Sequence, residues 1–126
     1  MDETPTPTGR EMEILKILWE LGPSSVRVVY RQLLDQQADD LAYNTVQTLL
    51  RIMEKKGLVS SHADGRAFIY TPLYSRDQSA VRFLDRVFDG AASQLVASLL
   101  EAERITPDEL KRLEALVNAA KKRTTR

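Results

Sequence analysis

The fold of this chain is decided by residues 44–59, which read Asn-Thr-Val-Gln-Thr-Leu-Leu-Arg-Ile-Met-Glu-Lys-Lys-Gly-Leu-Val. At a helical period these side chains separate into two opposite stripes. The apolar stripe occupies positions i, i+3, i+4 and i+7, which is typical of a helix face that packs into a core; it consists of Val46, Leu49, Leu50 and Met53. The opposite stripe is polar and consists of Asn44, Gln47, Thr48, Arg51 and Lys55. We therefore expect an amphipathic helix whose polar side faces outward.

The polar stripe is made of side chains that can recognise DNA. Asn and Gln pair with adenine through two hydrogen bonds, Arg pairs with guanine in the same way, and Thr can contact either base. Taken alone, the stripe is better explained as an ordinary solvated helix face, and DNA contact is favoured only by what surrounds the helix. The residues expected to contact DNA are Asn44, Thr45, Gln47, Thr48, Arg51, Lys55 and, in the hairpin described next, Arg66.

A β-hairpin is expected directly after this helix. Gly57 can supply the left-handed residue that ends a helix, and residues 58–62 and 67–71 alternate as two short strands. Asp64-Gly65 predicts a tight primed turn between them, with Arg66 at the tip. A hairpin in this place is the wing of a winged helix-turn-helix, and an arginine at its tip suits a backbone or minor-groove contact.

Two supporting helices are expected before residue 44. Thr8 and Glu11 have the spacing of a capping box, and Gly22-Pro23 ends the helix that they open. Its core side chains are Met12, Ile14, Leu15, Leu18 and Trp19. Ser24 or Ser25 then caps a second helix from Val26 to about Leu34, and residues 36–40 form a polar loop. The fold class is therefore mainly α with a small β-wing, and residues 8–72 form a winged helix-turn-helix DNA-binding domain.

Residues 73–126 are expected to form a helical dimerisation region that ends in a basic tail over residues 121–126, which we interpret as a solvated end. A capping box at Ser75–Gln78 opens one of its helices, and Thr106 as N-cap, Pro107 at the first helical position and the acid Glu109 open the last one. The apolar stripes could pack within one chain, but a homodimer is favoured because so short a segment gains too little core alone. The expected dimer contacts are Leu84, Val87, Phe88, Leu95, Leu99, Leu110, Leu113, Leu116 and Val117.

Composition excludes several other classes of protein. The chain has 126 residues, no cysteine and a single histidine, His62, so disulfides and thiolate metal sites are excluded and a histidine-based metal or catalytic site lacks partners. No phosphate-binding loop or nucleophile motif is present. We expect no enzyme, no cofactor and no metal. No apolar run could span a bilayer and no signal peptide is apparent, so a cytoplasmic protein without membrane insertion is expected.

The charge distribution agrees with DNA contact although the net charge is zero. Residues 1–41 hold four basic and eight acidic side chains, whereas residues 42–71 hold four basic and two acidic ones. The basic excess within the first half therefore lies on the polar stripe and the hairpin, and the distribution of charge matters more than its sum.

These segments resemble the penicillinase-repressor (BlaI/MecI) family of bacterial transcriptional regulators. The resemblance is carried by residues 44–51 and 55–57, by residues 64–72, and in kind by residues 15–19 and 86–90. It implies a repressor that binds inverted-repeat double-stranded DNA operators as a homodimer, with winged helices on the DNA and C-terminal helices in the dimer. The alternative is a winged-helix protein-interaction module without an operator of its own. The salt dependence of binding would distinguish the two functions, because phosphate contacts release counterions and protein contacts mostly do not.

The chain departs from the family pattern at three places. Relatives often have Ser-Pro-Lys where this chain has Ala42-Tyr43-Asn44, so we expect Asn44 and Gln47 to form their own capping box. In antibiotic-responsive members a membrane metalloprotease sensor cuts an Asn-Phe bond in the C-terminal helices. The resemblance therefore implies such a sensor as a further partner. The matching position here is Ser98-Leu99, which argues against cleavage as the inducing step. Copper-responsive relatives carry a cysteine cluster that this chain lacks, so the inducing signal is not identified.

Overall fold

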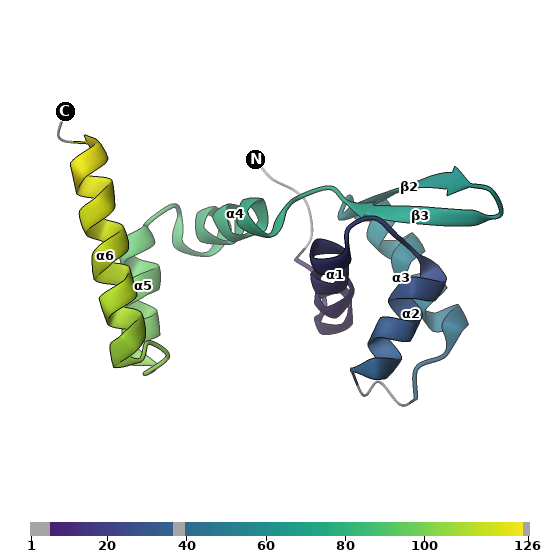
Figure 1. The fold of residues 1–126 in the computed structure, drawn as a ribbon, viewed down its shortest axis with the longest axis horizontal. Coiled ribbons are helices and arrows are strands. Elements are labelled where there is room, and N and C mark those ends of the chain that lie inside the picture. The colour runs from purple at the N-terminus through teal and green to yellow at the C-terminus, as the bar shows by residue number, and fades with distance from the viewer. Residues whose placement is uncertain (1–5, 37–39, 125–126) are drawn as a thin grey trace. The chain divides into compact units, whose positions relative to one another are not determined.

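The structure, a computed structural model, describes residues 6–36 and 40–124. Its elements in chain order are α1 (Gly9–Leu21), β1 (Ser24–Ser25), α2 (Val26–Asp35), α3 (Tyr43–Lys55), β2 (Val59–Asp64), β3 (Ala67–Pro72), α4 (Arg76–Phe88), α5 (Ala92–Glu101) and α6 (Pro107–Thr124). Figure 1 shows the chain as a ribbon. The mainly helical winged-helix fold expected from the sequence is confirmed, and the loop predicted over residues 36–40 falls partly on residues outside the described ranges.

The core of the first half is formed where α1, α2 and α3 meet the base of the sheet. The apolar stripe of α3 lies in it as predicted, with Val46, Leu50 and Met53 fully buried and Leu49 packed at its edge. Of the residues expected in α1, Trp19 lies at the edge of the core, where its Nε1 donates a hydrogen bond of 2.8 Å to the carbonyl of Tyr74. The buried residues of α1 are Glu11, Ile14, Leu15, Ile17 and Leu18.

The caps of α1 and α2 follow from their sequences. Thr8 and Glu11 form the predicted capping box at the start of α1. Of the two serines that could cap α2, Ser25 is the N-cap, since its Oγ accepts a hydrogen bond from the N–H of Val28. Ser24 is buried and its hydroxyl donates to the carbonyl of Gly22.

The two ends of α3 differ in how well the sequence predicted them. Gly57, with φ of 79°, ends the helix as expected: its N–H bonds the carbonyl of Glu54 and the next N–H bonds that of Met53, the pattern of a Schellman motif. The expected capping box of Asn44 and Gln47 is wrong. Ala42 is the N-cap, without a side-chain hydrogen bond, so Asn44 lies inside the first turn.

The sheet has three antiparallel strands in the order β1-β3-β2. The hairpin of β2 and β3, called the wing below, extends beyond the helices (Figure 1). Its turn is displaced by one residue from the predicted Asp64-Gly65: Asp64 pairs with Ala67, so Gly65 and Arg66 form the loop. Gly65 has a φ of 63°, as the first loop position of a primed hairpin turn requires. The strand β1 was missed because two residues carry no alternation.

The chain divides into two compact units, residues 1–80 and 81–126. The first unit reaches past residue 72, and the hydrogen bond from Trp19 to the carbonyl of Tyr74 lies within it. The functional division at residue 72 stays a prediction. The predicted capping box of α4 is confirmed by hydrogen bonds between Ser75 and Gln78 in each direction. The predicted N-cap of α6 is confirmed by the hydrogen bond from the N–H of Glu109 to the hydroxyl of Thr106.

The second unit contains no buried side chain among its described residues. The first unit, in contrast, has a core of buried apolar side chains. The expected dimer contacts Leu84, Phe88, Leu95 and Leu113 are half-buried, and Val87, Leu99, Leu110, Leu116 and Val117 are exposed. Residues 121–124 of the basic tail continue α6 as a helix. None of the described helices is long and apolar enough to cross a membrane.

Candidate nucleic-acid interface

The expected DNA contacts lie together on the outer side of α3 and on the wing. Asn44, Thr45, Thr48, Arg51 and Lys55 are exposed and Gln47 is half-buried. Because the apolar stripe fixes the rotation of α3 about its axis, this outward direction is set by burial of the opposite face. Arg66 is exposed in the turn of the wing.

A hollow of about 480 Å³ lies where α2, α3 and the wing converge; we call it the helix–wing hollow. It brings three of the expected contacts together, namely Gln47, Arg51 and Arg66. Asn44, Thr45, Thr48 and Lys55 are not among the residues that line it. Further lining residues come from the first turn of α2 and from β3; they include Ser25, Arg27, Phe68 and Tyr70.

The helix–wing hollow is suited to an anion. Its charged lining residues are Arg27, Arg51 and Arg66 against a single acid, Asp64. The first N–H groups of a helix have no partner within the helix and carry a partial positive charge, and the start of α2 faces the hollow through its N-cap Ser25. Three guanidinium groups and a helix N-terminus can together bind phosphate oxygens.

Tyr70 joins this surface to the core. Burial raises the pKa of its phenol; the negative charge of Glu54 raises this pKa further and the positive charge of Arg51 lowers it in part. The hydroxyl therefore stays protonated at neutral pH and can donate a hydrogen bond. The side chain of Glu54 accepts a hydrogen bond of 2.7 Å from the Oγ of Ser61, which ties α3 to β2.

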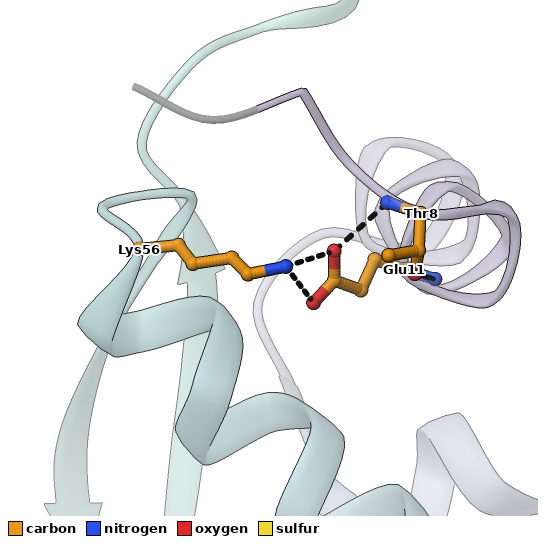
Figure 2. Close-up of polar contacts among 3 residues, drawn as sticks. All are labelled: Thr8, Glu11 and Lys56. Carbon is orange, nitrogen blue, oxygen red and sulfur yellow. Dashed lines mark hydrogen bonds and ion pairs between the residues drawn. The ribbon is translucent and has the colours of Figure 1, made fainter. Parts of the chain in front are cut away.

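The C-terminal end of α3 is fastened to the start of α1 by a buried ion pair, shown in Figure 2. Nζ of Lys56 lies 3.0 Å from both carboxylate oxygens of Glu11, and the N–H of Thr8 donates to the same carboxylate at 2.9 Å. Burial raises the pKa of the Glu11 carboxyl, but the hydrogen bonds from Thr8 and Lys56 and the charge of Lys56 outweigh it and leave this pKa below its usual value.

Sequence patterns alone did not identify Arg27, Tyr70 or the Glu11–Lys56 pair. Arg27 follows an N-cap serine, so its place in the first turn of α2 could have marked it as a phosphate contact. The alternation over residues 67–71 predicts a strand residue at Tyr70 and nothing more. Among the described residues no group of three or more His, Cys, Asp or Glu side chains is placed to hold a metal ion.

The chain is similar to known proteins over most of its length. A family model described as penicillinase repressor matches residues 7–119. The chain is 28% identical to the penicillinase repressor of Bacillus licheniformis over 98% of both chains. It is 32% identical to the transcriptional regulator BlaI of Mycobacterium tuberculosis, over 79% of this chain and 73% of that one.

Two solved structures share the fold of the first half. One is the solution structure of the DNA-binding domain of the repressor BlaI, with a TM-score of 0.52 and 28% identity, covering 62% of this chain and 93% of that one. The other is the Bacillus licheniformis BlaI monomeric form in complex with the blaP half-operator, with a TM-score of 0.50, 28% identity and the same coverage.

Proposed function

Since this chain belongs to the penicillinase repressor family of transcriptional repressors, as the match over residues 7–119 shows, we propose that it represses transcription in the bacterial cytoplasm by binding an inverted-repeat DNA operator as a homodimer. The observation that carries the proposal is the polar face of α3 beside the basic helix–wing hollow, with its apolar face held in the core. One side of the helix is thereby rigidly positioned and the other is free to enter a major groove.

The base contacts that we propose are Asn44, Thr45, Gln47, Thr48 and Arg51, because they occupy the first part of α3, which in such domains points at base edges. Lys55 and Arg66 are proposed to contact phosphates, since they lie at the far end of α3 and in the turn of the wing. Phosphate contacts orient the protein and base contacts select the sequence.

The second unit supports the proposed homodimer. Its helices bury no described side chain within one chain, and Leu116 and Val117 on α6 are 66% and 52% exposed. Exposed apolar stripes of this extent are typical of a surface that another chain covers. A related protein is described as binding a half-operator in its monomeric form, which agrees with one chain for each half of an operator.

A partner protease stays a prediction. Ser98 and Leu99 are exposed on α5, but the pair lacks the Asn-Phe sequence on which the expectation of cleavage rests. We therefore leave a membrane metalloprotease out of the proposed mechanism. Incubation of the full chain with such a protease, followed by mass spectrometry, would detect a cut at this bond.

The experiment that tests the function starts from DNA selected out of a random-sequence pool by the full-length protein. We expect the selected sequences to share an inverted repeat whose half-sites are about one helical turn (~34 Å) apart. Footprinting should then show symmetric protection, and sedimentation should show two chains on each operator. A winged-helix protein-interaction module would instead select no common sequence and bind every duplex with the same affinity.

A further inference from the structure

We propose that the helix–wing hollow is the seat of one DNA backbone phosphate and that the hydroxyl of Tyr70 donates a hydrogen bond to it. This inference rests on the proposed function and names a contact that neither the helix periodicity nor the polar stripe of α3 indicates. Tyr70 belongs to β3 and lines the hollow together with residues of α2 and α3, so one phosphate there would fix the position of α3 and the wing relative to the same DNA strand.

The first observation is the unused hydroxyl of Tyr70. The residue is only 4% exposed and belongs to the hydrophobic core, yet its hydroxyl has no hydrogen-bond partner among the described residues. Within those residues, no fully buried side-chain oxygen or nitrogen lacks a partner, so this oxygen is not completely buried, and Tyr70 is one of the residues that line the helix–wing hollow. A rigid donor with nothing to donate to is what a preorganised ligand contact requires.

The second observation is the positive charge around this donor. Arg27 and Arg66 line the same hollow, and Arg51, which we propose to contact a base, adds its positive charge from the side of α3. The helix α2 is ten residues long, and its first turn brings a partial positive charge to the hollow through Ser25. A neutral donor surrounded by cations and a helix N-terminus fits the oxygen atoms of a phosphate, which accept hydrogen bonds and carry the negative charge.

A backbone phosphate is favoured over a base because the walls come from three elements. Gln47 and Arg51 belong to the polar stripe of α3, while Arg27 belongs to α2 and Arg66 to the wing. In such domains base edges in the major groove are reached from the recognition helix, whereas the elements around that helix contact the backbone. The same chemistry would also hold a free phosphate ion, so the experiment has to separate the two sources.

The test compares Tyr70→Phe with the unmodified full-length protein on two duplexes, a selected operator and a scrambled duplex of the same length. Removing only the hydroxyl should weaken binding to both duplexes roughly 3- to 10-fold, as the loss of one hydrogen bond to a charged group does. The log–log salt slope should not change, because a neutral hydroxyl displaces no counterion. Arg66→Ala in parallel should lower that slope by about one unit.

The matched control is Tyr30→Phe, which removes a tyrosine hydroxyl outside the hollow and keeps the edge contact of this ring with Tyr43. It should leave both affinities unchanged. Thermal unfolding checks that Tyr70→Phe folds, and its midpoint should not fall, since the hydroxyl has no bond to lose within the described chain. A fall in the midpoint equal in free energy to the lost affinity would make the role structural and overturn the proposal.

A scan of operators with a single neutral methylphosphonate locates the phosphate. At one position in each half-site the substitution should weaken the unmodified protein more than it weakens Tyr70→Phe, since the variant has already lost part of the contact that the substitution removes. If the effects of Tyr70→Phe and of the methylphosphonate on the binding free energy were strictly additive at every position, the proposed phosphate contact of Tyr70 would be refuted. It would also be refuted by unchanged affinity of Tyr70→Phe on both duplexes, or by a loss confined to the operator, which would indicate base recognition.

A second arm uses inorganic phosphate at constant ionic strength. One outcome would overturn the proposal: free phosphate binds saturably in a way that depends on Tyr70, while Tyr70→Phe keeps its DNA affinity. The hollow would then be a site for a free anion and not for a DNA phosphate. Failure of the repressor function is distinguishable from these outcomes. It would appear as equal affinity of the unmodified protein for operator and scrambled duplex, and the scrambled duplex would still report the role of Tyr70.

Discussion

Glu11 and Lys56 lie 45 residues apart in sequence and form a buried ion pair, with Nζ of Lys56 3.0 Å from each oxygen of the carboxylate. The side chain of Glu11 is 2% exposed and that of Lys56 is 27% exposed. Lys56 is the C-cap of α3 and Glu11 closes the capping box of α1, so the pair fastens the end of the proposed DNA-contacting helix to the start of the chain's first helix.

Breaking this pair should destabilise the protein, and by different amounts from its two sides. Lys56→Met leaves a buried carboxylate without its cation and should lower the free energy of unfolding by about 2–3 kcal/mol. Glu11→Gln leaves a lysine that can turn toward water and should cost about 1–2 kcal/mol. Urea denaturation at fixed protein concentration measures both. The control is Glu13→Gln on the exposed Arg10–Glu13 pair, which should cost less than about 0.5 kcal/mol; equal losses in all three variants would contradict this account.

The stability of the protein should fall in acid partly through Glu11. Its pKa is lower in the folded protein than its usual value, so the folded state favours the ionised carboxyl. This contribution is complete above the unfolded pKa of about 4.3 and is lost as the pH falls through the lower folded pKa. The difference in unfolding free energy between the unmodified protein and Glu11→Gln should therefore shrink between about pH 6 and pH 3. A difference that is constant over this range would show that ionisation of Glu11 does not contribute.

The proposed base contacts should change specificity together with affinity. Replacing Gln47, Thr48 or Arg51 by Ala should cost on the order of 1–3 kcal/mol of operator binding and relax the preference at particular base pairs. Affinities for a set of operators with single-base changes measure this effect. If Arg51→Ala weakens binding equally on every operator, Arg51 contacts a phosphate and the assignment is wrong.

The proposed phosphate contacts should behave in the opposite way. Lys55→Ala and Arg66→Ala should weaken binding to all sequences alike, and each should reduce the log–log salt slope by about one unit because one fewer counterion is released. Binding measured from low to moderate salt tests this. A changed base preference in Arg66→Ala would assign the turn of the wing to sequence recognition.

A charge placed in the apolar stripes of the second unit should dissociate the proposed dimer. Leu113→Asp or Leu99→Asp would bury an unpaired carboxylate in the interface, at a cost of several kcal/mol, and operator affinity should fall with the dimer. Sedimentation of the full chain measures the association. Lys111→Asp, on the same helix as Leu113 but outside the stripe, is the control, and a stable monomer of the unmodified protein at micromolar concentration would refute the dimer.

The winged-helix order of elements could be predicted because each signal is local. The apolar stripe of α3, the capping box of Thr8 and Glu11 and the left-handed Gly57 depend on residues within about one or two helical turns. The errors were also local. Asn44 is a good N-cap in isolation, but the helix starts at Tyr43, and Gly65 rather than Asp64 takes the first position of the hairpin loop.

By itself, then, the sequence determined which segments are helix or wing and which face of α3 is apolar, because side-chain period and cap chemistry act between near neighbours. Only the tertiary structure decided that Glu11 meets Lys56, that β1 adds a third strand beside β3, and that Tyr70 lines one hollow together with Arg27 and Arg51. These relations join residues that are far apart in the chain. They exist only after the helices and strands have packed around one core, which no local pattern describes.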